Sequence, residues 1–264
     1  MARVILHIGM EKTGSSALQR FFARNRVMLR MAGLRYPRME GAPAESHCDL
    51  VDAIAADGTG AELVETYAAA VEDAATTLIS AEGLSAPDPG FAQAFGPWAE
   101  RFDVTVVVFL RRQDEWALSA YRQAVIDPGV AEARGFADWL DDPVTRARLD
   151  YATMLEGWNA VFGADRIRVL RYPHEIPVVP AFLRAAGLPD RLRLLPERNL
   201  RVNESVGDAA LLEALERNGG TGEVPQMPQP ARDALLGELE PGNRWIAQTF
   251  RPDLGSLFGL DSAA

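Results

Sequence analysis

The sequence predicts an α/β protein with a central parallel sheet flanked by helices. Four short runs of β-branched and other apolar residues, at 3–8, 76–80, 104–110 and 166–172, are separated by stretches of mostly helical periodicity. Because these runs are apolar almost throughout, we expect the strands to be buried on both faces. Strands of this kind are typical of a parallel sheet that lies between layers of helices.

Length and composition set the broad class of the protein. With 264 residues, 48% of them hydrophobic and 24% charged, the chain is long enough for one large folded domain. We expect this domain to span 1–264, with a ligand-binding α/β core in 1–175 and a mostly helical part in 176–264. No apolar run approaches the roughly 18 residues of a membrane span, and the N-terminus lacks the pattern of a signal peptide, so a cytoplasmic location is expected.

Charge and cysteine content argue against several partners. The net charge of -10 disfavours binding to nucleic acid or to an anionic membrane surface, because both rely on a basic face. It is compatible with a small anionic ligand, since a few arginines and a helix N-terminus set the local potential. The single cysteine, Cys48, cannot form an internal disulfide, and no Cys/His cluster has zinc-ligand spacing, so no metal site is expected.

The first apolar run leads directly into a glycine turn, HIGMEKTGSS at residues 7–16. A turn between a strand and a helix binds phosphate-like anions, because the helix N-terminus offers unpaired N–H groups and the positive end of a dipole. Glycine lets the backbone approach the anion, Lys12 supplies a charge, and the hydroxyls beside it add donors. An ATP-binding loop has its lysine after the last glycine, whereas Lys12 precedes Gly14, so we expect a different anion here.

Apolar residues after this turn, and again after the third run, follow helical spacing. We expect them to be the buried faces of two helices rather than a cofactor box. These residues are Leu18, Phe21, Phe22 and Met28 in the first case and Trp116, Leu118, Tyr121 and Val125 in the second.

A second anion-binding feature follows the third run. In VTVVVFLRRQDEWALSAYRQ, residues 104–123, the strand ends at Leu110 and Arg111 stands just beyond its carboxyl end. Ligands of open parallel sheets bind outside these carboxyl ends, so we expect Arg111 beside the first turn. Its planar guanidinium suits bidentate contact with a phosphate, and Ser119 lies eight residues later on the following helix. Arg112 either shares this contact or is solvated.

Together the two segments resemble the sulfotransferases that use 3′-phosphoadenosine 5′-phosphosulfate (PAPS) as donor. The 5′-phosphosulfate loop of that family reads approximately G-x-x-[KR]-[TS]-[GA]-[TS]-[TS], and HIGMEKTGSSALQRFF matches it with serine in place of the commoner threonine. The family's 3′-phosphate motif is an arginine at a strand end followed eight residues later by serine, as in Arg111 and Ser119. The resemblance covers roughly the first half of the chain and implies the P-loop nucleoside-kinase-like fold of the sulfotransferases.

The resemblance also implies roles for these residues. Lys12 would neutralise charge on the leaving phosphate and the bridging oxygen, and Arg111 with Ser119 would hold the 3′-phosphate. The 5′-phosphosulfate would be cradled by the backbone and side chains of Thr13, Gly14, Ser15 and Ser16. No metal is expected in the reaction, because Lys12 and the helix N-terminus carry the positive field.

A general base is expected at the mouth of a strand that faces the donor, because sulfuryl transfer needs a group that accepts the proton of the nucleophile. In TTLISAEGLS, residues 76–85, Glu82 stands just past the second strand. The stretch resembles the S-x-E segment of the glycan-directed branch of the family, in which a glutamate is the proposed base. Partial burial would raise the pKa of this carboxyl. The alternative for Glu82 is a helix cap or an ion pair with an arginine.

The three histidines are weaker candidates. His47, in ESHCDLVDAI, is similar to a histidine-plus-leucine segment of bacterial relatives, which implies contact with the acceptor or a role as the alternative base. Its plainer interpretation is a surface histidine at a helix end. His7 is expected to be a core histidine in the first strand, and His174 a turn residue.

The second half of the chain says less about function. NLRVNES, residues 199–205, resembles a loop that returns near the nucleotide, which makes Arg201 and Asn203 candidate donor contacts. The R-K-G element of many eukaryotic cytosolic members is not evident, so the adenine contacts are left unassigned. A Gly/Pro-rich stretch at 218–231 is expected to be a surface loop, and acceptor specificity is expected to depend on such loops, including 36–48.

The sequence thus predicts an enzyme that moves the sulfuryl group from PAPS to a hydroxyl and releases adenosine 3′,5′-bisphosphate. The acceptor is expected to be a carbohydrate or glycolipid. Two alternatives are a P-loop kinase acting on a small molecule, which needs ATP and magnesium, and a nucleotide-binding protein without catalytic activity. The oligomeric state is not predicted.

Overall fold

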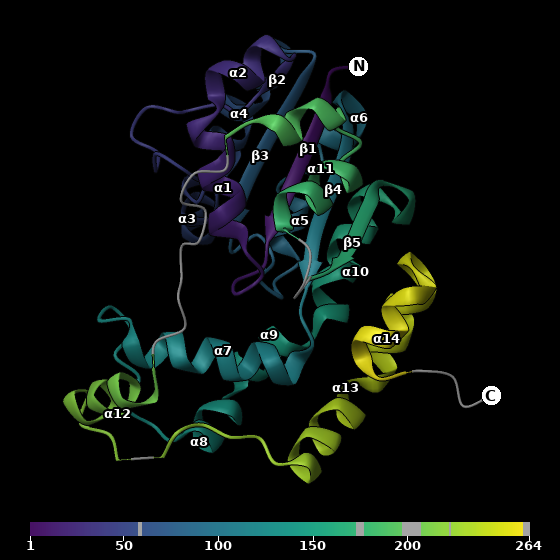
Figure 1. Cartoon of the computed structure of the whole chain (residues 1–264). Coiled ribbons are helices and arrows are strands. Elements are labelled where there is room, and N and C mark those ends of the chain that lie inside the picture. The colour runs from purple at the N-terminus through teal and green to yellow at the C-terminus, as the bar shows by residue number, and fades with distance from the viewer. Residues whose placement is uncertain (58–59, 173–176, 197–206, 222, 261–264) are drawn as a thin grey trace.

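A parallel sheet between layers of helices forms the body of the computed structural model (Figure 1). The structure describes residues 1–57, 60–172, 177–196, 207–221 and 223–260. Within them, five strands, each parallel to its neighbours, lie in the order β2-β3-β1-β4-β5. The strands are β1 (Arg3–Gly9), β2 (Leu34–Arg35), β3 (Thr76–Glu82), β4 (Asp103–Leu110) and β5 (Ile167–Arg171).

The four predicted strands are confirmed, and one strand was missed. The missed strand is β2, which has only two residues and pairs with β3 at the sheet edge. A strand this short carries no alternating pattern that periodicity can detect. The predicted ends also shift slightly, because β3 continues to Glu82, which is therefore the last residue of the strand rather than a residue just beyond it.

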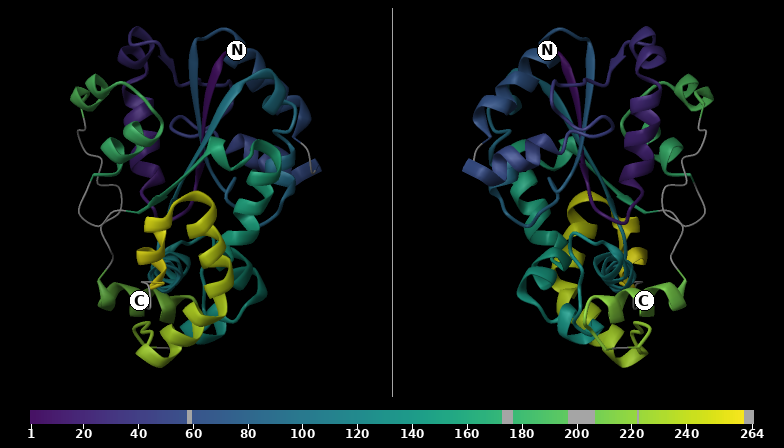
Figure 2. Two further views of the ribbon diagram at one scale, coloured as in Figure 1. Left: turned by 90° about the vertical axis from the view of Figure 1, so that its right-hand side faces the viewer. Right: turned by 90° about the vertical axis from the view of Figure 1, so that its left-hand side faces the viewer.

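One face of the sheet is covered by α1 (Ser15–Arg24), α2 (Arg26–Met31) and α11 (Val178–Ala185) (Figure 2). The core on this face includes Ile5, Leu18, Phe21, Phe22, Leu78, Val107, Phe109 and Phe182. The expectation that Met28 continues the buried stripe was wrong, since its side chain is 50% exposed. The reason is a break at Asn25, whose Nδ2 donates to the Phe21 carbonyl oxygen at 2.9 Å, so that α2 begins as a separate helix.

The other face packs against a larger group of helices. They are α3 (Asp49–Asp57), α4 (Ala61–Glu72), α5 (Gly90–Gln93), α6 (Trp98–Arg101) and α10 (Tyr151–Phe162). The core here includes Val4, Leu6, Ile79, Val106, Val108, Tyr67, Trp98 and Trp158. Because β1, β3 and β4 are covered on both sides, their near-continuous apolar sequences are explained.

Further helices lie beyond the carboxyl ends of the strands (Figure 1). They are α7 (Gln113–Ile126), α8 (Phe136–Leu140), α9 (Pro143–Leu149), α12 (Asp208–Arg217) and α13 (Gln229–Phe250), followed by α14 (Gly255–Phe258). In the described ranges, short 3-10 helices occupy Ala164–Arg166, Asp190–Leu194 and Pro252–Leu254. Trp116, Tyr121 and Val125 of α7 are buried as predicted, while Leu118 is only partly buried.

The C-terminal part of the described chain is helix and loop, as expected. The predicted surface loop at 218–231 is shorter, because α13 already begins at Gln229 with Pro230 in its first turn, where proline is well accommodated. No helix in the described ranges is long and apolar enough to cross a membrane.

Candidate functional site

The glycine turn after β1 is a tight, internally bonded loop. Lys12 and Gly14 both adopt positive φ, 62° and 82° respectively, a conformation that is unusual for lysine. The Thr13 hydroxyl donates to the Met10 carbonyl oxygen at 2.6 Å, and the Ser15 hydroxyl donates to the same oxygen at 3.0 Å. These two hydroxyls therefore stabilise the turn itself, and both side chains are buried.

The N-terminus of α1 opens from this turn. Gly14 is the N-cap and provides no side-chain cap; its carbonyl oxygen accepts the N–H groups of Ala17 and Leu18 at 3.0 and 3.2 Å. No residue in the described chain accepts a hydrogen bond from the N–H groups of Gly14, Ser15 or Ser16. Donors of this kind at a helix N-terminus, with Lys12 beside them, form a cup for an anion.

Side chains of α7 and α9 hold the turn in place. The Trp116 indole N–H donates to the Glu11 carbonyl oxygen at 3.2 Å, and the Glu11 carboxylate forms an ion pair with Arg148. The Lys12 ammonium donates to Oε1 of Gln123 at 3.3 Å. The sequence did not predict these contacts with the turn. It indicated only a core position for Trp116 and gave no signal for Glu11, Gln123 or Arg148.

Arg111 lies next to the turn, as predicted. Its guanidinium donates to the Lys12 carbonyl oxygen at 3.5 Å and forms an ion pair with Glu115, in which Nε and Oε2 are 3.6 Å apart. The same guanidinium lies 5.8 Å from the centre of the Tyr172 ring. Ser119 follows Glu115 by one turn of α7 and precedes Gln123 by one turn, so it lies on the face of α7 that meets Lys12.

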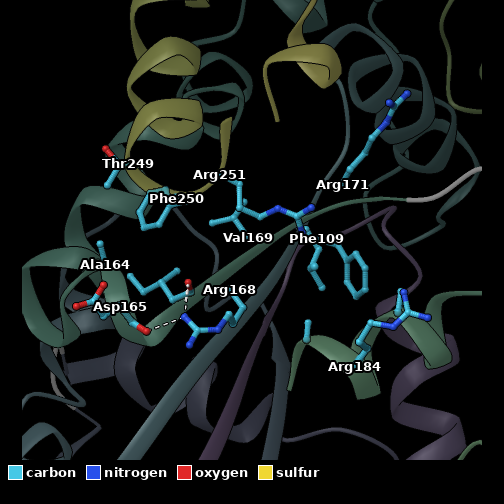
Figure 3. Close-up of a pocket in the computed structure, with 14 residues that line it drawn as sticks. Phe109, Ala164, Asp165, Arg168, Val169, Arg171, Arg184, Thr249, Phe250 and Arg251 are labelled. Atoms are coloured by element: carbon cyan, nitrogen blue, oxygen red, sulfur yellow. Dashed lines mark hydrogen bonds between the residues drawn. The ribbon is translucent and has the colours of Figure 1, made fainter. Parts of the chain in front are cut away.

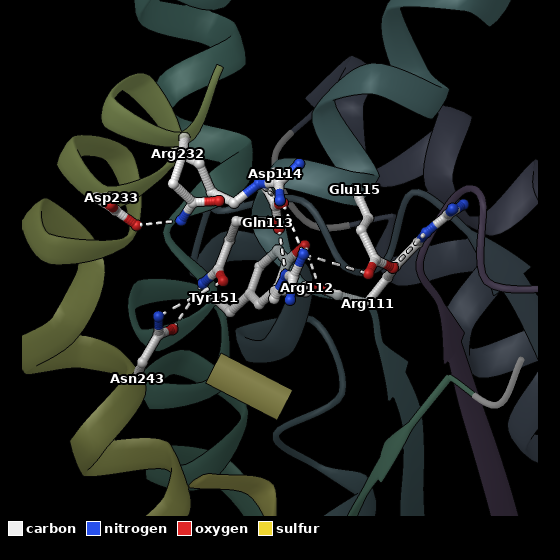
Figure 4. A network of polar contacts seen from close by, with 10 residues as sticks. Arg111, Arg112, Gln113, Asp114, Glu115, Tyr151, Arg232, Asp233 and Asn243 are labelled. Carbon is white, nitrogen blue, oxygen red and sulfur yellow. Dashed lines mark hydrogen bonds and ion pairs between the residues drawn. The ribbon is translucent and has the colours of Figure 1, made fainter. Parts of the chain in front are cut away.

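Arg112 belongs to a network that joins the start of α7 to α13 (Figure 4). The network also reaches Arg111, because Glu115 forms ion pairs with both arginines, at 3.5 Å with Arg112 and 3.6 Å with Arg111. It donates to both oxygens of the fully buried Asp114 carboxylate, at 2.6 and 2.9 Å, and Arg232 of α13 forms an ion pair with the same group at 2.7 Å. Gln113 donates to Asn243 of α13 at 2.6 Å. Arg112 is therefore not simply solvated: its side chain is 32% exposed, but its guanidinium is bound to a buried carboxylate.

Glu82 meets the turn because of strand register. Gly9 and Glu82 are paired residues at the ends of β1 and β3. A Cβ added at Gly9 would lie 2.8 Å from the Ser15 hydroxyl oxygen and 3.3 Å from Cγ of Glu82, so only glycine allows this approach. The carboxylate thus lies at the same corner of the sheet as the anion cup.

The electrostatics of this corner perturb both Glu82 and Lys12. Burial, reinforced by the nearby Glu11, raises the pKa of Glu82 to about 7, although the Lys12 charge and the neighbouring hydroxyls of Ser16 and Ser15 lower it in part. Burial, with a smaller contribution from Arg111, lowers the pKa of the Lys12 ammonium, and Glu11 and Glu82 oppose that shift. A carboxyl group with a pKa near 7 is suited to accept a proton at neutral pH.

His47 is buried, so it is not a surface histidine. The Ser80 N–H donates to its Nδ1 at 3.0 Å, which leaves Nε2 as the donor to the Pro37 carbonyl oxygen at 3.0 Å. Burial lowers the pKa of His47 to about 4, so the ring is neutral. Both ring nitrogens are engaged with the backbone, and this geometry favours anchoring of the 36–48 loop to β3 over proton transfer.

The remaining histidine and donor-loop predictions have different outcomes. His7 is a core histidine as expected, with Nδ1 2.7 Å from the Ser80 hydroxyl and its pKa lowered to about 3 by burial. His174, Arg201 and Asn203 lie outside the described residues. In the part of the chain that the structure describes, no group of three or more His, Cys, Asp or Glu side chains is placed to hold a metal ion.

Comparison with known proteins adds evidence on the fold. The chain matches no protein-family model and no curated protein. Among solved structures it is similar to the sulfotransferase from Alicyclobacillus acidocaldarius, with a TM-score of 0.58 and 18% sequence identity over 97% of this chain and 99% of that chain. A likeness at such low identity is evidence for a common architecture. The chain therefore has an α/β fold, with a five-stranded parallel sheet flanked by helices, that matches the structure of this sulfotransferase.

Proposed function

We propose that this protein is a sulfotransferase that moves the sulfuryl group of PAPS to the hydroxyl of a carbohydrate or glycolipid. The observation that carries the proposal is the contact of Arg111 with the Lys12 carbonyl oxygen at 3.5 Å, because it joins two anion-binding features into one site. The fold supports it, since a protein that matches nearly the whole chain in structure is a sulfotransferase. The carbohydrate assignment rests on the glutamate in the S-x-E segment.

The residues at this site are chemically suited to PAPS. The unpaired N–H groups of Gly14, Ser15 and Ser16, together with the Lys12 ammonium, would bind the 5′-phosphosulfate. Arg111 would bind the 3′-phosphate with help from the Ser119 hydroxyl. Its present contacts, at 3.5 and 3.6 Å, are long for hydrogen bonds, so a phosphate can replace them at little cost.

In the proposed reaction, the acceptor oxygen attacks the sulfur and the bond from sulfur to the bridging oxygen breaks. Glu82 accepts the proton of the acceptor hydroxyl, and adenosine 3′,5′-bisphosphate leaves with the electron pair of the broken bond. Lys12 and the N-terminus of α1 stabilise the negative charge that develops on the leaving phosphate. The raised pKa of Glu82, about 7, makes the carboxylate an effective proton acceptor near neutral pH.

The geometry of the turn favours this function over that of an ATP-dependent kinase. In an ATP-binding loop, the hydroxyl that follows the lysine binds magnesium. Here that residue is Thr13, which is fully buried and donates its hydroxyl to the Met10 carbonyl oxygen at 2.6 Å. The Thr13 hydroxyl is therefore already engaged within the turn and is not placed to bind a magnesium ion.

A ligand screen tests the proposal. Adenosine 3′,5′-bisphosphate is expected to raise the melting temperature of the protein, whereas ATP with magnesium is expected to have little effect. Stabilisation by ATP with magnesium alone would favour the kinase instead. A second measurement separates an enzyme from a nucleotide-binding protein without activity: Glu82→Ala should keep its affinity for adenosine 3′,5′-bisphosphate but lose transfer of labelled sulfate from PAPS to a panel of glycans.

A further inference from the structure

A cavity of about 900 Å³ opens along β5 at the side of the sheet, and none of Lys12, Glu82 or Arg111 lines it (Figure 3). Its floor is apolar and includes Phe109, Val169 and Phe250. Its walls come from β5, from α11 on one face of the sheet and from the end of α13 on the other. The cavity is thus a groove that follows a strand.

That strand forms an edge of the sheet in the described part of the chain. β5 pairs only with β4 among the described strands, and it stands last in the strand order. An edge strand presents backbone N–H and C=O groups to a further strand. The Arg168 guanidinium meets part of this need in the free protein, because it donates to the carbonyl oxygens of Asp165 and Ile167 at 2.6 and 3.2 Å.

Four exposed arginines line the groove in two pairs, one on each face of the sheet (Figure 3). Successive residues of a strand point to opposite faces. Arg168 points to the same face as Leu170, which packs against the core that α11 covers. Arg184 comes from α11 and therefore lies on this face too. Arg171 points to the opposite face, as Val169 does. Arg251, at the end of α13, lies on that same face.

The positive charge of the groove is only partly neutralised. Arg251 forms an ion pair with Asp253, and Asp165 is the one acidic residue among those that line the groove. Arg171 and Arg184 have no hydrogen bond or ion pair to any residue in the described ranges. This clustering stands out in a chain with a net charge of -10. A second copy of the chain is a poor occupant, because pairing of β5 with β5 would bring arginines against arginines.

We propose that the groove binds an extended acidic segment of a partner protein, which adds to the sheet beside β5. Main-chain hydrogen bonds to the edge of β5 would hold the segment, and one of its N–H groups would replace the Arg168 guanidinium on the Ile167 carbonyl oxygen. Side chains of consecutive acidic residues would point alternately to the Arg168 and Arg184 pair and to the Arg171 and Arg251 pair. The groove therefore selects a segment with an Asp or Glu at every position rather than one in which acidic and neutral residues alternate. This proposal does not depend on sulfuryl transfer.

The test uses the full chain and a fluorescently labelled peptide of alternating glutamate and aspartate, with fluorescence anisotropy as the readout. We expect binding that the double charge reversal Arg171→Glu with Arg184→Glu weakens by about ten-fold or more. The matched control is Arg217→Glu, which changes an exposed arginine of α12 outside the groove and should leave the affinity unchanged. Hydrogen exchange of the β5 amides, residues 167–171, should slow when the peptide is present.

Two further probes make the outcome decisive. The same peptide with N-methyl groups at alternate peptide bonds keeps its charge but cannot pair as a strand, and it should bind at least about ten-fold more weakly. Equal affinity of the two peptides would overturn strand addition and leave only a charge contact. Binding of a sulfated oligosaccharide in place of the peptide, or no binding of the peptide at all, would also overturn the proposal.

Discussion

The guanidinium of Arg111 donates to the carbonyl oxygen of Lys12 at 3.5 Å, although the two residues are 99 positions apart in the chain. The contact exists because β1 and β4 are neighbours and each leads from its carboxyl end through a short connection into a helix. It joins the glycine turn to the start of α7. Several expected outcomes depend on this junction and on the residues around it.

Removal of Arg111 should weaken binding of adenosine 3′,5′-bisphosphate. We expect Arg111→Ala to cost about 2–4 kcal/mol of binding free energy, as measured by calorimetry, because a phosphate loses a bidentate charged partner. Arg217→Ala is the matched control, since Arg217 is an exposed arginine at the end of α12, away from the glycine turn. Equal losses of affinity in the two variants would contradict the assignment of the phosphate to Arg111.

Removal of the Lys12 charge should abolish transfer without unfolding the protein. Lys12→Gly is the best substitution, because the φ of 62° at this position suits glycine. We expect the transfer rate to fall by about 100-fold or more, the scale of a lost charge-stabilising group, while the melting temperature stays equal or rises. A Lys12→Gly variant that transfers the sulfuryl group at the wild-type rate would show that Lys12 has no part in the mechanism.

The pKa of Glu82 predicts how activity and stability depend on pH. Transfer should increase as the pH rises through about 7, where the carboxylate forms, and Glu82→Gln should lose transfer at every pH.

The buried Glu82 carboxylate destabilises the folded protein when it is ionised. Its folded pKa, about 7, lies above the ordinary value of 4.5, so its favourable contribution to stability is complete below pH 4.5 and is lost as the pH rises through 7. Glu82→Gln should therefore raise the free energy of unfolding by about 1–3 kcal/mol above neutral pH, with little change near pH 4.5. Chemical denaturation at both pH values measures this difference.

His47 is expected to contribute to stability rather than to proton transfer. His47→Ala would leave the Ser80 N–H and the Pro37 carbonyl oxygen without their partner, at a cost of about 2–4 kcal/mol of unfolding free energy. His47→Asn keeps a donor and an acceptor and should cost less.

The pH dependence of stability follows from the same burial. The pKa of His47 in the folded protein, about 4, lies below its ordinary value of 6.5, so the contribution of His47 to stability is complete above pH 6.5 and is lost as the pH falls through 4. A transfer rate that disappears in a fully folded His47→Asn variant would restore the role of base.

Gly9 should tolerate no side chain. Gly9→Ala would place a Cβ 2.8 Å from the Ser15 hydroxyl oxygen and 3.3 Å from Cγ of Glu82, so the turn or the carboxylate must move. We expect a loss of about 1–3 kcal/mol in stability, together with lower transfer. The control is Gly237→Ala in the middle of α13, where an added Cβ has no neighbour within 4 Å and where alanine should stabilise the helix by about 0.5–1 kcal/mol. Thermal unfolding of both variants tests the contrast.

The candidate site could be predicted in part because its two halves are local patterns. The glycine turn follows β1 directly, and Arg111 with Ser119 follows β4, so each motif is contiguous or nearly so in the sequence. Partners from distant segments have no such signal. Gln123 contacts Lys12 and Trp116 contacts Glu11 only because α7 packs under the turn, and Arg148 reaches Glu11 from yet another helix.

The sequence by itself determined four strands of the described chain, the position of the glycine turn and the parallel sheet that carries it. Apolar periodicity and glycine placement are local properties, and they act before any distant contact forms. Only the tertiary structure decided the strand order, the burial of His47 and the inward hydroxyls of Thr13 and Ser15. It also decided that Gly9 and Glu82 stand side by side. Those features follow from packing and register, which depend on the whole chain at once.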